Sequence, residues 1–142
     1  MADKKAINIE DFFTEDNEKE GVWFEPKVGG QLCGIQFLVT GTGTDENVVA
    51  SERFEKQVDE LEDEKDPIEK SKKRKVLEAN RVAEFVIGIR AAEGEKVLFG
   101  GKPLEYSVPL VQQILLKSPL IRSEIIKFAT NTANFIKREK NA

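Results

Sequence analysis

Residues 118–135, SPLIRSEIIKFATNTANF, carry the pattern that decides the predicted fold. Ser118 suits a helix N-cap and Pro119 suits the first helical turn, so we expect a helix to begin here. The positions of one face recur at steps of four, three, four and three residues, a heptad-like seam made of Ile121, Ile125, Phe128, Thr132 and Phe135. This spacing predicts a helix over about residues 119–138.

Three further helices are predicted upstream, over about residues 45–65, 70–90 and 107–117. Thr44 or Asp45 can cap the first helix, and its apolar stripe is Ala50, Phe54, Val58 and Leu61. The second helix follows the break at Pro67 and carries Ala79, Ala83 and Val86 on one face. The third is expected to begin at a serine cap followed by a proline in the first turn, at Ser107 and Pro109.

Residues 21–40 read as strands rather than as a helix. Residues 22–24 and 35–39 are β-branched and aromatic runs, and the stretch PKVGG between them, residues 26–30, suits a turn. The two runs therefore predict an antiparallel β-hairpin over residues 21–40. Because an isolated hairpin is only marginally stable in water, helices must cover one of its faces.

The predicted fold class is α+β: mainly helical, with a small N-terminal antiparallel β-hairpin packed on a helical bundle. Residues 21–142 are expected to form this single domain. Residues 1–20 are acidic and are expected to form a partly ordered arm, with the aromatic pair Phe12 and Phe13 placed to dock on the body.

The absence of histidine in the 142-residue chain argues against an enzyme. It removes every Ser-His-Asp or Cys-His arrangement and every histidine metal ligand. The one cysteine, Cys33, permits no intrachain disulfide and is expected to be a small buried hydrophobe rather than a reactive thiol. No spacing singles out a catalytic carboxylate pair, so we expect no enzymatic activity, no cofactor and no metal.

Charge and hydropathy point away from nucleic acid and membranes. The net charge is −4, and no apolar run approaches the ~20 residues of a membrane span. The basic run at residues 72–75 follows the acidic block at residues 59–66, and the two neutralise each other if the chain folds back at Pro67. The glycine-rich residues 41–44, GTGT, lack the lysine of a phosphate-binding loop and suit a tight strand-to-helix turn.

The last two predicted helices carry more apolar residues than one seam requires. Such a pair can bury one face on its own sheet and offer another face to a partner helix, although a domain of this size also needs most of its apolar side chains inside. Trp23 is open to the same two interpretations, an exposed binding anchor or a cover of the core.

Residues 118–135 resemble the C-terminal segment of the tail assembly chaperones of long-tailed (siphovirus-type) bacteriophages. In that family a helix enters after a short proline break and ends in an alanine-rich pattern that terminates in Asn-Phe. Residues 21–23, GVW, and 34–39, GIQFLV, resemble the strand pair that precedes the helices there. The resemblance covers this strand pair and the final helix, and little of the middle of the chain.

The resemblance implies a chaperone that binds the long, helical, hydrophobic tape measure protein and promotes assembly of the tail tube around it. Such a protein acts in the host bacterial cytoplasm and is not expected in the mature virion. A frameshift-extended form would recruit the tail tube protein, and self-association is expected through remaining apolar surface.

The partner-binding residues on this interpretation are Leu116, Leu120, Ile125, Phe128 and Phe135, with Trp23 as a flank. Two other functions stay open from the sequence. One is a structural tail or connector protein of the virion, and the other is a nucleic-acid-binding regulator that uses residues 72–75.

Overall fold

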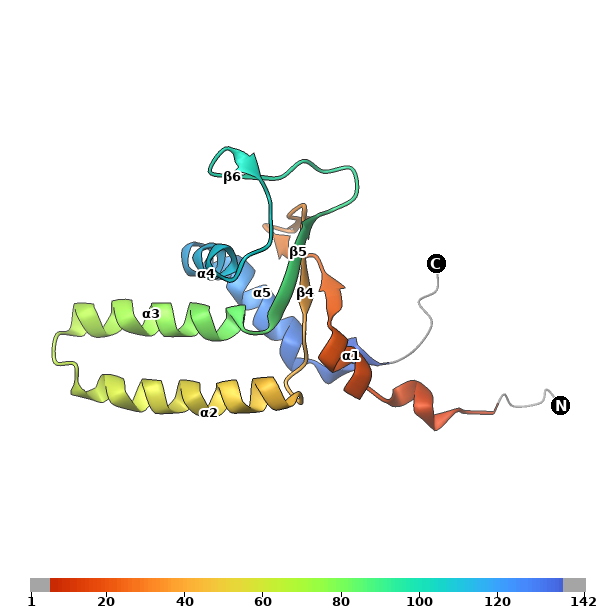
Figure 1. The fold of residues 1–142 in the computed structure, drawn as a ribbon, viewed down its shortest axis with the longest axis horizontal. Coiled ribbons are helices and arrows are strands. Elements are labelled where there is room, and N and C mark those ends of the chain that lie inside the picture. Colours follow the sequence, from red (N-terminus) through yellow and green to blue (C-terminus); the bar gives the residue numbers. More distant parts are fainter. Residues whose placement is uncertain (1–5, 137–142) are drawn as a thin grey trace.

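The structure is a computed structural model and describes residues 6–136, in which a small sheet packs on several helices (Figure 1). The helices are α1 (Glu15–Glu20), α2 (Asp45–Glu60), α3 (Pro67–Ala83), α4 (Val108–Lys117) and α5 (Pro119–Thr130). Three 3-10 turns accompany them: η1 (Ile9–Phe12), η2 (Leu61–Asp63) and η3 (Thr132–Phe135). The predicted α+β, mainly helical class is confirmed.

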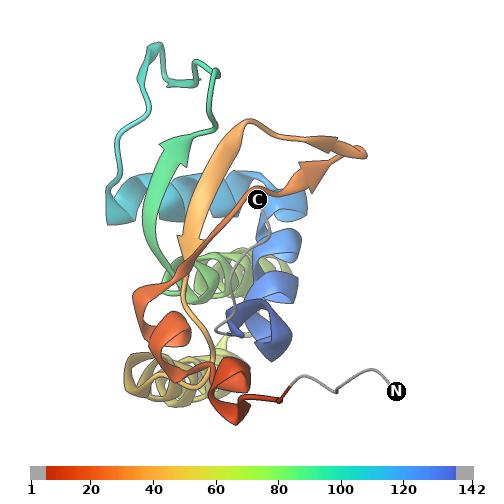
Figure 2. The ribbon, with the colours of Figure 1, turned by 90° about the vertical axis from the view of Figure 1, so that its right-hand side faces the viewer.

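The main sheet is antiparallel and has three strands, β1 (Val22–Phe24), β4 (Ile35–Val39) and β5 (Val86–Ala91), in the order β1-β4-β5. Two small hairpins complete the strands: β2 (Lys27–Val28) with β3 (Gln31–Leu32), and β6 (Leu98–Phe99) with β7 (Lys102–Pro103). Figure 2 shows α4 and α5 behind one face of the sheet, whereas the other face is crossed by no helix of the described chain. The fold therefore has two layers, with one sheet face open.

The predicted hairpin of β1 and β4 is confirmed. The two strands pair antiparallel, with Trp23 opposite Leu38 and Phe24 opposite Phe37. Residues 26–30, predicted as a plain turn, instead enter a small second hairpin of β2 and β3. The predicted pairing of the two strands is therefore right, but the segment that connects them contains a hairpin of its own and is not a plain turn.

The helix predicted over residues 70–90 is wrong at both ends. The carboxylate of Asp66 accepts hydrogen bonds from the backbone N–H of Ile68 (2.9 Å) and Glu69 (3.4 Å), so α3 already begins at Pro67 and it ends at Ala83. Residues 86–91 form β5, which pairs with β4 as the third strand. The run FVIGI, residues 85–89, is β-branched and aromatic, so pairing with a free strand edge outweighs its helical spacing.

The other predicted helices need smaller corrections. α2 ends as an α-helix at Glu60, short of residue 65, and α4 agrees with the predicted 107–117 within one residue. α5 ends at Thr130, because the Asn131 side chain accepts a hydrogen bond from the backbone N–H of Ala133 (3.2 Å) and starts η3. The predicted seam is therefore broken before Thr132, and residues 137 and 138 lie outside the described residues.

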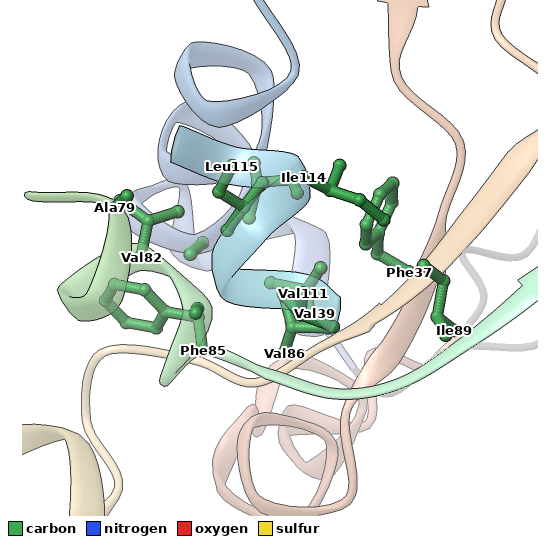
Figure 3. Packing of buried hydrophobic residues seen from close by; sticks show 13 residues of the cluster. Phe37, Val39, Ala79, Val82, Phe85, Val86, Ile89, Val111, Ile114 and Leu115 are labelled. Atoms are coloured by element: carbon green, nitrogen blue, oxygen red, sulfur yellow. The ribbon is translucent and has the colours of Figure 1, made fainter. Parts of the chain in front are cut away.

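The hydrophobic core lies between the sheet and α3, α4 and α5 (Figure 3). Phe37 and Val39 of β4 are fully buried, and Val86 and Ile89 of β5 join them. The helices contribute the buried residues Ala79, Val82, Ala83, Val111, Ile114, Leu115, Ile125 and Ala129. A β-strand alternates its side chains between two faces, so this inward set leaves Trp23, Leu38 and Gly88 on the open face.

α2 and α3 form an antiparallel helical hairpin that projects beyond the sheet (Figure 1). Near its tip Lys70 pairs with Glu62 (3.2 Å) and Lys73 pairs with Glu64 (2.6 Å). The hydrogen bond from Lys73 also lowers the pKa of Glu64. The chain does fold back at Pro67, and the predicted pairing is confirmed for Lys73, whereas Lys72 and Arg74 pair within α3 with Glu69 and Glu78.

The N-terminal segment is attached to the body through α1. The backbone N–H of Gly41 donates to the Glu18 carbonyl (2.9 Å), and the Asn17 side chain donates to the Phe135 carbonyl (3.2 Å). Phe12 and Phe13 are each 57% exposed, so the predicted docking of this pair on the body is wrong for a single chain.

The register of β5 predicts that substitutions at Ile87 and Ile89 change the free energy of unfolding by very different amounts. Ile89→Ala should lower the free energy of unfolding by about 2–5 kcal/mol, because it leaves a cavity in the core. Ile87→Ala, at the exposed bulge of the strand, should change it by about 0.5 kcal/mol or less. Urea unfolding of both variants measures the difference, and equal losses would contradict this register.

Candidate functional site

An apolar groove of about 440 Å³, which we call the α5 groove, lies between α2, α3 and α5. Its apolar residues are Phe54 of α2, Val82 of α3, and Pro119 and Ile126 of α5. Its polar residues are Arg74, Glu78, Arg81, Arg122 and Ser123. The apolar residues form the floor of the groove. Three arginines against one glutamate give its lining a net positive charge.

Helical spacing explains why these residues share one surface. Arg74, Glu78 and Val82 are four residues apart on α3 and therefore lie on one helix face. Arg74 donates to Glu78 (Nε to Oε1, 3.2 Å), which holds this side of the rim. On α5, Arg122 donates to the Leu115 carbonyl at the end of α4 (2.9 Å), so this arginine is also fixed in place.

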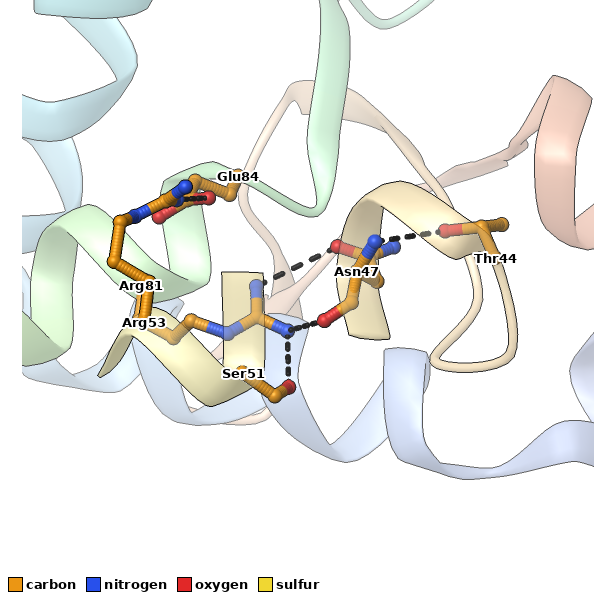
Figure 4. Close-up of polar contacts among 6 residues, drawn as sticks. All are labelled: Thr44, Asn47, Ser51, Arg53, Arg81 and Glu84. Atoms are coloured by element: carbon orange, nitrogen blue, oxygen red, sulfur yellow. Dashed lines mark hydrogen bonds and ion pairs between the residues drawn. The ribbon is translucent and has the colours of Figure 1, made fainter. Parts of the chain in front are cut away.

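Arg81 lies beneath the groove and is buried, with 8% of its surface exposed. Its guanidinium Nη2 donates to the Asn47 carbonyl (3.1 Å) and to Ser51 Oγ (2.9 Å), and Nη1 donates to Asn47 Oδ1 (3.4 Å), as Figure 4 shows. The guanidinium carbon also lies 4.2 Å from the centre of the Phe85 ring. Burial lowers the pKa of Arg81, but an arginine stays charged in proteins, so the buried charge needs these partners.

The network continues from Asn47 to the sheet. The Asn47 amide donates to Thr40 Oγ1 (2.9 Å) and to the Gly41 carbonyl (2.6 Å), and the Thr40 hydroxyl donates to the Phe85 carbonyl (2.9 Å). Hydrogen bonds thus connect α3, α2 and the ends of β4 and β5. In the part of the chain that the structure describes, no buried side-chain nitrogen or oxygen lacks a partner.

This hydrogen-bond network was not predicted from the sequence. The available signal was Asn47, which precedes Ala50 and Phe54 at helical steps of three and four on an otherwise apolar stripe. A polar residue in such a position needs an internal partner.

A second, shallower hollow of about 300 Å³ lies on the other side of α5. Its floor is Phe24, which stacks on Phe128 with ring centres 4.3 Å apart. Phe128 in turn meets Phe135 edge to face at 5.7 Å. Its remaining lining residues are Glu25, Lys27, Glu124, Lys127 and Asn134, so its charges balance.

The predicted partner-binding residues divide into two groups. Leu116 and Leu120 are 37% and 62% exposed at the corner between α4 and α5, and Phe128 is half-buried in the hollow just described. Ile125 and Phe135 are completely buried. The expectation that these two contact a partner is therefore corrected, because both side chains fill the core.

Trp23 lies on the open face of the sheet and does not flank α5. The Arg90 guanidinium lies 3.9 Å from the centre of a Trp23 ring, a cation–π contact. The indole lies over Gly88, where an added Cβ atom would be 3.4 Å from it, at van der Waals contact. Trp23 is half-buried and covers part of the open sheet face, not the core between the sheet and the helices, so that of its two predicted roles the core-covering one is corrected.

Two other candidate sites are filled or inert. The Glu18 carboxylate accepts from the Gly43 N–H (3.3 Å) and so occupies the glycine-rich turn where an anion would bind. Cys33 is half-buried and its Sγ lies 3.5 Å from the Ile35 carbonyl. Burial raises the pKa of the Cys33 thiol, which disfavours the reactive thiolate.

The buried network predicts coupling between Arg81 and Asn47. Asn47→Ala should lower the free energy of unfolding by about 1–3 kcal/mol, because it leaves buried polar groups without partners. In the double variant Asn47→Ala/Arg81→Met the losses should be non-additive by about 0.5–3 kcal/mol. Urea unfolding of the single and double variants measures this.

The surface pair Arg53 and Glu84 provides the control for that cycle. Arg53→Met should cost no more than about 1 kcal/mol, because the pair is exposed. Strictly additive losses at Asn47 and Arg81 would contradict the proposed coupling.

The assignment of Ile125 to the core and of Leu120 to the exposed surface can be tested by substitution. Ile125→Ala should lower the free energy of unfolding by about 2–5 kcal/mol, whereas Leu120→Ala should change it by about 0.5 kcal/mol or less. Thermal and urea unfolding report both. A large loss at Leu120 would show that the corner is part of the core.

The sequence matches no family model, and neither the curated proteins nor the solved structures show significant similarity to the chain. Within residues 6–136 no helix is both long and apolar enough to cross a membrane, and no three acidic or cysteine side chains are grouped to hold a metal ion. The geometry of the α5 groove, together with the sequence pattern, is therefore the basis for inferring function.

Proposed function

We propose that the protein is a tail assembly chaperone of a long-tailed bacteriophage, and that it holds apolar helical segments of the tape measure protein in the α5 groove. The groove is the observation that carries the proposal. It is open, has an apolar floor from three helices, and is about 440 Å³ in volume. An amphipathic helix binds by laying its apolar face into such a groove.

The residues of the groove suit a helical ligand. Phe54 and Ile126 are only half-buried and offer apolar contact on opposite walls. Arg74 and Arg122 can pair with acidic residues that flank the apolar stripe of a bound helix, which fixes its orientation. The exposed Leu120 follows Pro119 and adds apolar surface at the corner between α4 and α5.

The proposal includes the cellular setting that the sequence resemblance implies. The chaperone acts in the host bacterial cytoplasm, keeps the tape measure protein soluble, and is absent from the mature virion. A frameshift-extended form brings the tail tube protein to the complex. Charged residues make up 34% of the chain, which supports solubility of a protein that also exposes an apolar groove.

Filling the groove should block binding of the tape measure protein. Ser123 lines the groove and is half-buried, so Ser123→Trp places an indole there without removing an apolar contact. When the chain is co-expressed with the tape measure protein encoded beside it, this change should reduce the recovered complex at least about tenfold, equivalent to about 1.4 kcal/mol. Pull-down through a tag on the chain measures the recovery.

Ser71→Trp is the matched control, because Ser71 is exposed on α3 outside the groove. Equal recovery with the two tryptophan variants would show that the α5 groove is not the binding site. No recovery with the unaltered chain would contradict the chaperone function itself. Stoichiometric amounts of the chain in purified virions would instead identify a structural tail or connector protein.

A further inference from the structure

The segment before α1, residues 6–13, which we call the arm, exposes four large apolar side chains. Ile7 and Ile9 are 82% and 72% exposed, and Phe12 and Phe13 are each 57% exposed. Scattered apolar residues are normal on a surface, but four large exposed ones within seven residues of sequence are a concentration of the kind that marks an interaction site. The body of the same chain leaves this patch uncovered.

The base of the arm is held in place. α1 is bound to the turn before α2 through Gly41 and Glu18, and to η3 through Asn17 and Phe135. Thr14 Oγ1 also donates to the Glu18 carboxylate (3.0 Å), at the point where the arm joins α1. Figures 1 and 2 show η1 leading away from the sheet and from α2 to α5. The arm is therefore presented outward from a fixed point.

The arm also has a definite charge. Glu10 and Asp11 lie within η1, and Glu15 and Asp16 begin α1, so the apolar patch is bordered by acidic residues. The α5 groove has the complementary character: its floor is apolar, and the arginines of its lining outnumber Glu78, with which Arg74 is paired. Apolar and electrostatic complementarity thus point to the same pair of surfaces.

We propose that the arm of one chain docks in the α5 groove of a second copy of the chain. Phe12 and Phe13 contact the apolar floor, and the acidic residues of η1 face the rim arginines. The contact joins two different surfaces, so every copy offers one arm and one groove, and repetition produces a ring or an open chain. The arm would cover the groove to which the tape measure protein binds; this competition, unlike the docking itself, rests on the proposed function.

Other hollows fit the arm less well. The hollow at Phe24 and Phe128 has two acidic and two basic residues at its edge and offers no net attraction. The hollow between α2 and α3 near Leu61 is lined by Lys72 and Lys73 against Glu60, and Lys73 is already paired with Glu64. Its positive excess is therefore smaller than that of the α5 groove, where three arginines stand against one glutamate. The α5 groove is therefore the receptor that charge favours.

Disulfide trapping tests the docking directly. In chains carrying Cys33→Ser, Phe12→Cys is placed on one tagged chain and Ser123→Cys on an untagged chain. After mixing and mild oxidation, a non-reducing gel should show the tagged–untagged heterodimer forming several times faster than with Ser71→Cys in place of Ser123→Cys. Equal rates for the two partners, or no heterodimer, would overturn the proposal.

A single chain that carries both Phe12→Cys and Ser123→Cys distinguishes the two sources of an arm. Disulfide-linked dimers and larger species support docking on a second copy. A disulfide confined within the monomer would show that the arm fills its own groove, and would overturn the proposal.

Sedimentation velocity of the purified chain gives an independent reading. The unaltered chain should self-associate with rising concentration, and Phe12→Glu/Phe13→Glu should weaken this association at least tenfold. Val48→Glu/Val49→Glu is the matched control, because these adjacent residues are 46% and 58% exposed on α2 outside the groove. Equal weakening by both pairs, or no association of the unaltered chain, would overturn the proposal. These measurements need no tape measure protein, so their failure leaves the chaperone function to its own test.

Discussion

The buried guanidinium of Arg81 is the constraint on which the arrangement of the helices depends. Its charge cannot be removed by deprotonation, so hydrogen-bond acceptors must stand at fixed places around it. α2 supplies them through Asn47 and Ser51. Asn47 then bonds to Thr40, which fixes the end of β4 relative to α2. A helix that gives the core little apolar surface is thus held mainly by polar contacts, and its position is set by hydrogen-bond geometry.

This constraint explains why an open groove persists next to a packed core. Apolar attraction alone is non-directional and would favour collapse of Phe54 onto Ile126. The Arg81 network holds the first half of α2 against α3, and the ion pairs of Lys70 and Lys73 hold the far end of the α2–α3 hairpin. With both ends fixed to α3, α2 stays apart from α5. Buried polar groups often contribute more to specificity than to stability, and here they specify the position of α2 and with it the shape of the groove.

The parts of the fold that local chemistry determines were predictable from the sequence. The caps at Thr44 and Ser118 fixed where two helices begin, and the β1–β4 pairing followed from two β-branched runs separated by a turn. β5 was missed because residues 85–89 suit either a helix or a strand, and only the distant β4 edge decides between them. For the site, periodicity identified a face of α5 but not what covers it, so Ile125 was taken for an interface residue. Arg81 was missed because its burial depends on partners 30 and 34 residues away in sequence.

An exposed apolar groove creates a conflict for any protein that must stay soluble before its ligand arrives. The same surface that binds an apolar helix also favours uncontrolled association. The proposed docking of an arm from another copy would resolve this conflict if the contact is weak, which the small size of the arm favours. Only a few side chains of the arm make contact, and ordering them costs conformational entropy, so the net affinity is modest. On the proposed function, a long helical ligand would contact more of the groove than the arm does, together with the exposed corner at Leu120, and would therefore displace the arm. On this proposal, self-association and ligand binding are alternative states of one surface, and the exposed aromatic arm, whose η1 residues are not buried in their own chain, has a role in assembly.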